Sequence, residues 1–406
     1  MCTVVEIEDE LTDTHPVTPR TSARTQGVAP SATLAFAAEV AAAAAQGRRL
    51  VNLSGGDPDV DTPPHIVEAA VIALRAGRTH YAPGRGTPQL REAIVRSLPG
   101  GVTRDPGTDV LVTGSAKLAL ALALDAVVDP GDEVVILGPA WVSYAPLVRL
   151  RGGIPVELPL RPDEGYRLTA DGLRSVTCER TKAIIVNTPC NPMGRVFDAT
   201  ELHAVAAVAR ERDSVIISDE VYSRLVFDGV HRSLAEVAPE RTLVVDGLSK
   251  GFAMTGWRLG WLHGPTDLVG AATLVYEHTV SCAPTFIQDA AVVALTAPES
   301  ATAVAEMVER YRRRRDLVLV ELDGSPLRTA SPEGAFYLFP DVSALGVDGA
   351  GFSRYLLETE DVAVLPGVAF GAAFANHVRL SLAVPDAVLL GGVRRLRASA
   401  EALASG

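Results

Sequence analysis

Seven short apolar runs, separated by segments with helical periodicity, constrain the fold of this chain more than any other feature. Their apolar residues do not alternate with polar ones, as they would in strands with one face in water. Such runs, interleaved with helices, are typical of a mostly parallel sheet with helices on both faces. The predicted strands span residues 110–113, 134–137, 154–158, 183–187, 215–218, 243–245 and 259–262.

The pattern changes after Pro298, and this change predicts a second domain. A long charged helix over 299–322 precedes three strand-like pieces and a final helix from Asp386. We therefore predict an α/β fold with a large domain at 63–298 and a smaller α+β domain at 299–406. Residues 27–62, which include an alanine-rich helix at 32–46, are expected to complete the small domain. Residues 1–26 are polar and without periodicity, and are expected to form a mobile extension.

Composition excludes several kinds of partner. The formal net charge of −12 argues against nucleic acid or an anionic membrane. The four cysteines show no CxxC motif and no metal-ligand spacing with histidine, so no metal is expected. No apolar run reaches the ~18 residues that span a membrane, and the acidic first ten residues do not resemble a signal peptide. A cytoplasmic protein is expected.

Lysine is rare in this chain, and one lysine follows a predicted strand. Only Lys117, Lys182 and Lys250 occur, against 34 arginines, obtained as 37 basic residues minus three. Lys250 stands in the loop after strand 243–245, and Arg258 follows eight residues later. A deprotonated lysine forms imines with carbonyl compounds, and arginine binds phosphate. The pair therefore suits a carbonyl cofactor that carries a phosphate.

Other polar side chains follow the remaining strands, where ligands bind in open α/β sheets. Ser115 precedes a helix whose free N–H groups form an anion site, although an ordinary helix cap is an equal alternative. The side chain of Lys117, in the first turn, is expected to be solvated. Trp141 offers a flat ring for stacking, and Asn191 a rigid amide. Asp219, opposite a pyridine nitrogen, would keep that nitrogen protonated.

These motifs stand in one order on consecutive strand ends, and this order carries a resemblance. The chain resembles the fold-type I pyridoxal-phosphate enzymes of the class I/II aminotransferase family, in their aspartate-aminotransferase-like branch. The resemblance runs from about Pro30 to the C-terminus. It rests on Asn191-Pro192, Asp219-Glu220-x-Tyr222, Ser249-Lys250 and Thr255-Gly256-Trp257-Arg258.

The resemblance implies roles for the residues around the cofactor ring. Lys250 would bind pyridoxal phosphate covalently and move the proton in catalysis. Asp219 would pair with the ring nitrogen, and Tyr222 would act with them as a third catalytic residue. Tyr222 and Asn191 would donate hydrogen bonds to the phenolic oxygen, while Trp141 would stack on the ring.

It also implies how the phosphate is held. Ser115, Ala116, the backbone of Lys117 and Arg258 would hold the phosphate. Tyr81 would reach the phosphate of a partner subunit, which implies a homodimer with composite sites.

The substrates follow from the same resemblance. Arg379 would bind the α-carboxylate of the substrate, helped by Gly56, Asn191 and Trp141. The implied reaction moves an amino group between an L-amino acid and a 2-oxo acid by a ping-pong mechanism. Met193 replaces a threonine that is common in the family, and Arg85 is a candidate for side-chain recognition. The amino acid itself stays open.

Three alternatives compete with this interpretation. Gly247 to Gly251 matches the G-x-S-x-G nucleophile elbow, with Ser249 as the nucleophile of a hydrolase. A transcription regulator with an aminotransferase-like sensor would need a preceding DNA-binding module, which ~26 residues are too few to form. Elimination, decarboxylation, cyclisation or oxidation with the same cofactor is also compatible with the fold.

Overall fold

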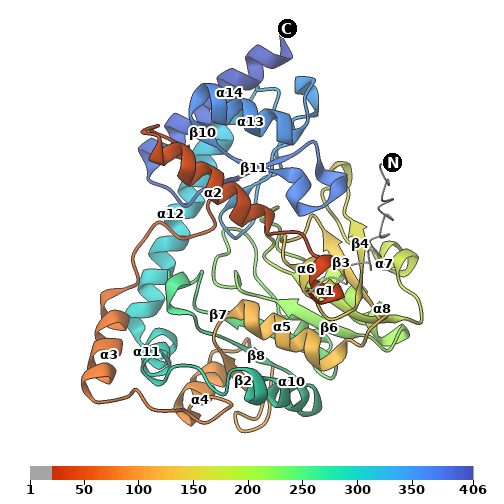
Figure 1. The fold of residues 1–406 in the computed structure, drawn as a ribbon, viewed down its shortest axis with the longest axis vertical. Helices are drawn as coiled ribbons and strands as arrows, with labels where there is room; N and C mark the ends of the chain where they lie inside the picture. The colour runs from red at the N-terminus through yellow and green to blue at the C-terminus, as the bar shows by residue number, and fades with distance from the viewer. Residues whose placement is uncertain (1–20, 406) are drawn as a thin grey trace, which may run out of the picture.

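The centre of the molecule is one seven-stranded sheet, seen in a computed structural model that describes residues 21–405 (Figure 1). The strands lie in the order β2-β8-β7-β6-β5-β3-β4. Only β8 runs antiparallel to its neighbours. The mostly parallel seven-stranded sheet is thus confirmed. The strands are β2 (Val110–Thr113), β3 (Glu133–Gly138), β4 (Ile154–Pro159), β5 (Thr181–Asn187), β6 (Val215–Asp219), β7 (Thr242–Gly247) and β8 (Gly260–His263).

Burial of both faces explains why the strands are continuously apolar. In β5, Ala183 and Ile185 pack into a cluster with α5 (Ala116–Val127) and α10 (Thr266–Thr279). Ile184 and Val186 pack into another cluster with α8 (Ala199–Glu211). Burial of the larger side chains, such as Ile184, Ile185 and Val186, contributes roughly 1.5–3 kcal/mol each. Neither face of the strand can therefore carry solvent-facing polar residues.

A third cluster packs helices against the end of the sheet that holds β2 and β8. It joins Val112 and Trp261 of those strands to buried residues of α3, α4 and α11. The remaining helices of this part are short. They are α3 (Pro64–Arg75), α4 (Pro88–Arg96), α6 (Tyr144–Arg149), η1 (Pro162–Glu164), α7 (Ala170–Val176), α9 (Leu234–Val237), η2 (Thr255–Trp257) and α11 (Thr285–Thr296).

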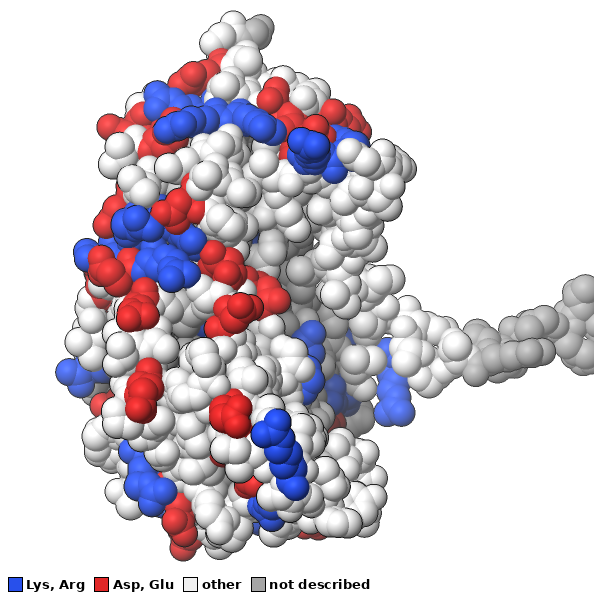
Figure 2. Space-filling model, turned by 90° about the vertical axis from the view of Figure 1, so that its left-hand side faces the viewer, with Lys and Arg blue, Asp and Glu red and all other residues white. Residues whose placement is uncertain are grey.

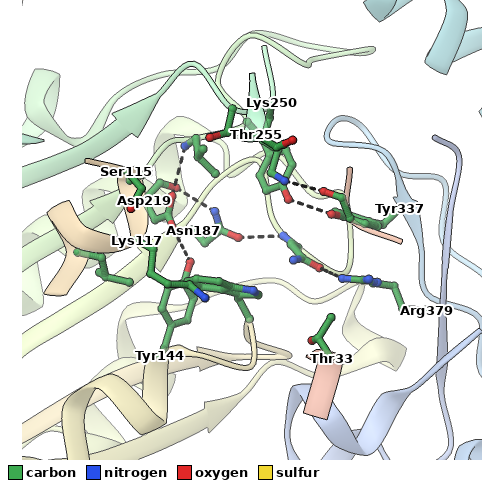
Figure 3. Close-up of a pocket in the computed structure, with 18 of the residues that line it drawn as sticks. Thr33, Ser115, Lys117, Tyr144, Asn187, Asp219, Lys250, Thr255, Tyr337 and Arg379 are labelled. Atoms are coloured by element: carbon green, nitrogen blue, oxygen red, sulfur yellow. Dashed lines mark hydrogen bonds between the residues drawn. The ribbon is translucent and has the colours of Figure 1, made fainter. Parts of the chain in front are cut away.

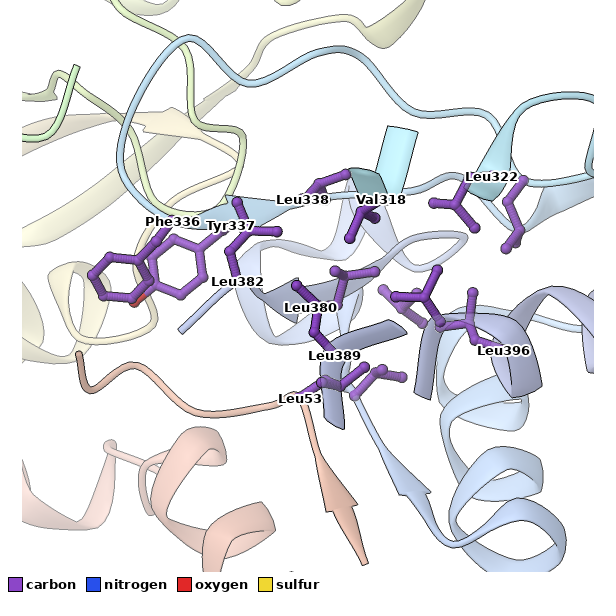
Figure 4. Close-up of a cluster of buried hydrophobic side chains, with 14 of the residues drawn as sticks. Leu53, Val318, Leu322, Phe336, Tyr337, Leu338, Leu380, Leu382, Leu389 and Leu396 are labelled. Carbon is purple, nitrogen blue, oxygen red and sulfur yellow. The ribbon is translucent and has the colours of Figure 1, made fainter. Parts of the chain in front are cut away.

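The C-terminal part has a core of its own, to which the N-terminal segment contributes. Leu53 packs there with Leu380, Leu389 and Leu396 (Figure 4). Val51 of β1 pairs with Val362 of β10. The elements of the N-terminal segment and of the chain after α11 are α1 (Ala23–Gln26), α2 (Ala32–Ala45), β1 (Val51–Asn52), α12 (Pro298–Leu322), β9 (Tyr337–Leu338), η3 (Ser343–Leu345), α13 (Gly349–Glu360), β10 (Val362–Ala363), β11 (Leu365–Pro366), η4 (Gly367–Phe370), η5 (Ala372–Phe374), β12 (Val378–Ser381) and α14 (Asp386–Ala404).

The predicted domain boundaries stay a prediction. The C-terminal core also includes Tyr222 and Leu225, which follow β6 in the large part, so apolar contacts continue across the proposed division. Of the predicted extension, residues 1–20 lie outside the described residues, and Ala23–Gln26 form α1.

A buried arginine ties three segments together beside the sheet. Arg314 of α12 is 4% exposed and donates to Asp59 at 2.9 Å and to Asp386 at 2.7 Å. A buried guanidinium needs such partners, because an unpaired charge in the interior is costly. The loop after Ser54, the long helix and the start of α14 are thus held to one another.

The surface carries charges of both signs. Figure 2 shows Lys and Arg interspersed with Asp and Glu on one face rather than gathered into a single basic patch. Within residues 21–405 no single helix is both long and apolar enough to cross a membrane. The pair α11 and α12 passes that test only together and is bent by 74°.

Candidate active site

A cavity of about 330 Å³ lies where β5, β6 and β7 end (Figure 3). Polar side chains from several strand ends face into it, together with residues of β9 and β12 from the C-terminal part. This position is the one at which open α/β sheets bind ligands. The residues that line it include Gly56, Ser115, Ala116, Lys117, Trp141, Tyr144, Asn191, Asp219, Tyr222, Lys250, Arg258, Tyr337 and Arg379.

Lys250 lies in the loop after β7, which ends at Gly247. Buried Leu248 packs in the apolar cluster that also contains residues of α3. The two residues that follow it, Ser249 and Lys250, line the cavity. The Lys250 ammonium donates to the Gly56 carbonyl at 2.5 Å. Burial lowers the pKa of Lys250 to about 8, and the neighbouring guanidinium groups of Arg379 and Arg258 act in the same direction. At pH 7 roughly a tenth of this lysine is therefore neutral, and thus nucleophilic.

Asp219 is the last residue of β6 and is buried. The Tyr144 hydroxyl donates to its Oδ2 at 2.7 Å, and the Val221 amide to its Oδ1 at 3.3 Å. The side chain of Asn187 donates to the Asp219 carbonyl at 2.9 Å and fixes the strand end. Burial raises the pKa of Asp219 to about 6, and the Tyr144 hydrogen bond opposes that shift. A cationic ring nitrogen in the cavity would stabilise the carboxylate.

Arg379 of β12 is buried at 2% exposure and faces the cavity from the C-terminal part. It donates to Asn191 Oδ1 at 3.0 Å and to the Ser54 carbonyl at 2.6 Å. Its Nε has no hydrogen-bond partner among the described residues. The residue lines the cavity, and a guanidinium in this position is suited to bind a carboxylate.

The start of α5 and the end of the β7–β8 connection form an anion-binding corner. Ser115 caps α5 by accepting from the Leu118 amide at 3.1 Å, and the first amides of the helix border the cavity. Arg258 lines the same corner and donates to the Thr255 carbonyl at 2.9 Å. Gly260 permits this packing, because a Cβ there would lie 2.3 Å from the Ala116 nitrogen. Helix dipole and guanidinium together favour a phosphate.

Trp141 and Lys117 border the cavity side by side. The Lys117 ammonium lies 4.8 Å from the centre of the Trp141 ring, and that ring meets Tyr144 edge-on at 5.4 Å. Burial lowers the pKa of Lys117, and Arg258 adds to the shift. The expectation of a merely solvated side chain is therefore incomplete, because this ammonium also lines the cavity.

The donor set fits pyridoxal phosphate. The anion corner matches its phosphate, buried Asp219 its ring nitrogen, and the partly neutral Lys250 its aldehyde. The Tyr222 hydroxyl and Asn191 line the cavity beside them, where a phenolic oxygen needs donors. The Arg379 guanidinium, which lines the same cavity, suits a substrate carboxylate.

Not every predicted residue lies at this cavity. Tyr81 is 91% exposed and does not line it. Neither Arg85 nor Met193 borders the cavity. Arg85 donates to the Thr108 carbonyl at 2.6 Å, and Met193 is buried in the apolar cluster that contains residues of α8. Ser249 does line it, but no histidine of residues 21–405 does, which leaves a serine nucleophile without its base.

Sequence reasoning assigned no site role to several cavity residues. Tyr144 stands in the loop that holds Trp141, and Asn187 ends β5, so both carried a usable positional signal. Tyr337 and Thr33 lie in β9 and α2, far along the chain from the strand ends. Only their tertiary contacts identify them.

Comparisons with known proteins agree with this geometry. The family described as aminotransferase class I and II matches residues 48–396. The aspartate/prephenate aminotransferase of Thermus thermophilus is 44% identical over 368 residues, which cover 90% of this chain and 94% of that protein. The aspartate aminotransferase of Pyrococcus abyssi is also 44% identical, over 82% of this chain and 87% of its own length.

A solved structure gives the same result. The structure of Thermus thermophilus aspartate aminotransferase with maleate has a TM-score of 0.90 and 41% sequence identity. The match covers 94% of this chain and 100% of that one. The predicted family and fold type are confirmed.

Proposed function

Because the chain belongs to the class I and II aminotransferase family, we propose pyridoxal 5′-phosphate as its cofactor and an acidic amino acid as its donor. The protein is an enzyme that transfers an amino group between an amino acid and a 2-oxo acid. One observation carries the proposal: Lys250, Asp219 and Arg379 line a single cavity together with an anion corner.

The cofactor residues have distinct tasks in this proposal. When bound, pyridoxal phosphate supplies an aldehyde carbon for the amino group and a ring that withdraws electrons from the substrate. Lys250 holds it covalently, and Asp219 keeps its carboxylate against the ring nitrogen. Tyr222 and Asn191 donate to the ring oxygen, and Trp141 covers the ring.

The phosphate is held at the corner already described. Ser115 and the first amides of α5, at Ala116 and Lys117, donate to it, and Arg258 supplies positive charge. A phosphate held by these groups would keep the cofactor in the cavity that Lys250 also lines.

Lys250 also moves the proton. With the cofactor bound, the Lys250 amine would act first as the base that accepts the α-carbon proton of the substrate and then as the acid that returns it. Arg379 holds the α-carboxylate meanwhile, and Gly56 leaves room beside it. The same residues serve the second oxo acid in reverse, which gives the ping-pong order.

Two positive groups support an acidic donor. Arg379 is assigned to the α-carboxylate, and the Lys117 ammonium lines the same cavity over Trp141. A second carboxylate on the substrate side chain would meet this ammonium. The names of the Thermus thermophilus and Pyrococcus abyssi relatives, which include aspartate, support the same substrate class.

A donor screen tests the proposal. Purified protein mixed with pyridoxal phosphate should turn yellow, and amino acids added one at a time should remove the visible absorbance. Aspartate or glutamate should do so most efficiently. Formation of an elimination, decarboxylation or oxidation product, without amino transfer by any donor, would favour another reaction of the same cofactor.

Replacing Lys117 with alanine should change the choice of donor. The backbone amide stays in place, while the loss of one charge-assisted contact should lower kcat/KM for aspartate by roughly 10- to 100-fold. The value for alanine, which has no second carboxylate, should change less than threefold. Steady-state kinetics with both donors measure the difference, and Lys182→Ala, at an exposed lysine, is the control. An equal loss for both donors would contradict the assignment.

We also propose that the protein acts as a homodimer. Tyr81 is 91% exposed, and Ile72 and Leu274 are apolar residues with 58% and 60% exposure. A partner subunit would cover such residues, and Tyr81 would then reach the partner's phosphate. Sedimentation analysis gives the mass in solution that decides this point. The expected cytoplasmic location stays a prediction.

A further inference from the structure

Tyr337 touches three functional groups of the cavity, although no sequence motif marked it. Its hydroxyl lies 3.0 Å from the Tyr222 hydroxyl. The Arg379 guanidinium lies over its ring, 4.3 Å from the ring centre (Figure 3). A Cβ at Gly56 would lie 3.1 Å from the same hydroxyl, so this glycine leaves room for it.

The surrounding strands fix the Tyr337 ring. Tyr337 pairs with Ser381 of β12, which places Arg379 diagonally across the strands on the same face. Phe336 packs at 4.6 Å from the ring centre, and Tyr222 meets the ring edge-on at 5.9 Å. With 1% exposure, the side chain has no space to turn away.

The number of hydrogen bonds that the two tyrosine hydroxyls can donate determines which of them is the donor in their contact. Each hydroxyl has the other as its one hydrogen-bond partner within residues 21–405. A hydroxyl has a single proton to donate. If the Tyr222 hydroxyl donates its hydrogen bond to the ring oxygen of the cofactor, the Tyr337 hydroxyl must be the donor in the contact between the two tyrosines.

We propose that Tyr337 is a positioning residue that donates to the Tyr222 oxygen and so directs the Tyr222 proton into the cavity. The inference rests on the proposed function. Hydrogen bonds in a chain polarise one another, so a donor behind Tyr222 makes Tyr222 a stronger donor in turn. Tyr337 has a second, separate task, because its ring face holds the Arg379 guanidinium in place.

The two tasks belong to different atoms and can be separated. Tyr337→Phe removes the hydroxyl and keeps the ring over Arg379. Tyr337→Leu removes both. Tyr276→Phe is the matched control: Tyr276 is also fully buried, and its hydroxyl has no partner among the described residues.

The first readout is the pH titration of the visible absorbance of the cofactor-loaded protein. This absorbance follows the proton that the cofactor's ring oxygen shares with the nitrogen of Lys250. A donor on the oxygen stabilises its negative charge and lets that proton leave at lower pH. Tyr337→Phe should therefore move the midpoint upward by roughly half a unit and lower kcat about fivefold.

The second readout is the affinity of the loaded protein for maleate, a dicarboxylate without an amino group. Tyr337→Phe should leave the maleate Kd within about twofold, because the ring still faces Arg379. Tyr337→Leu should weaken it about fivefold. Tyr276→Phe should change neither readout.

Other results would contradict either the positioning role of Tyr337 or the proposed function. An unchanged midpoint and kcat in Tyr337→Phe, or an equal shift in Tyr276→Phe, would overturn the positioning role. A wild-type protein that gained no visible absorbance with pyridoxal phosphate would refute the proposed function, and this inference with it.

Discussion

Replacing Lys250 with alanine is expected to lower the rate of amino transfer roughly 10,000-fold, because one amine both binds the cofactor and moves the proton. Lys250 lines the cavity, where its ammonium donates to the Gly56 carbonyl at 2.5 Å. We expect that neither Lys117, whose ammonium lies over the Trp141 ring, nor exposed Lys182 can replace it. Single-turnover kinetics with aspartate, together with mass spectrometry after borohydride reduction, measure the loss of both rate and attachment.

The pKa of Lys250 makes this prediction sharper. The amine attacks an aldehyde only when neutral, and burial lowers its pKa to about 8. The rate at which the cofactor-free protein takes up pyridoxal phosphate should therefore rise as the pH increases from 6 to 9, and level off above the pKa. Lys182→Ala should keep the wild-type profile. Covalent attachment that persisted in Lys250→Ala would place the reactive amine elsewhere.

Replacing Asp219 with asparagine should lower kcat about 1,000-fold, the range found when one preorganised electrostatic group is removed. The amide has nearly the same shape and can still accept from Tyr144, so the cavity should keep its form. What it lacks is the negative charge that holds the ring nitrogen protonated, and with it the electron withdrawal from the substrate. Steady-state kinetics of the loaded variant measure the effect.

Two companion variants show whether charge is the cause. Tyr144→Phe removes the 2.7 Å hydrogen bond to Asp219 but keeps the carboxylate, and should cost at most about tenfold. Glu133→Gln neutralises another buried acid. Glu133 is the first residue of β3, whereas the cavity lies at the carboxyl ends of the strands, so this variant should leave kcat unchanged. A loss in Asp219→Asn no larger than in Tyr144→Phe would mean that the charge is not essential.

The sequence was most informative where local pattern and topology coincide. Asp219 and Lys250 each follow a buried parallel strand, and parallel strands bring their carboxyl ends to one edge of the sheet. Their presence in one cavity could therefore be predicted without knowing any contact. The helix predicted to follow Ser115 begins at Ala116, because a capping serine before an apolar run marks a helix start.

Contacts that depend on the register of short strands could not be predicted. Tyr337 lies in a strand of two residues, and its approach to Tyr222 and Arg379 depends on pairing between β9 and β12. The antiparallel direction of β8 could not be predicted either, because a short apolar run has the same pattern in both directions. The path of the Lys117 side chain along Trp141 depends on rotamers that sequence does not encode locally.

The pairing of β1 with β10 has a consequence for biosynthesis. Val51 pairs with Val362, the Ser381 amide donates to the Leu53 carbonyl at 2.7 Å, and Arg379 donates to the Ser54 carbonyl at 2.6 Å. These contacts join residues more than 300 positions apart, and such distant closures come late in folding. The strands that carry Asp219 and Lys250 can emerge from the ribosome and pair well before the carboxylate site exists. A nascent chain should thus acquire the groups that bind its cofactor before it acquires the arginine that selects its substrate.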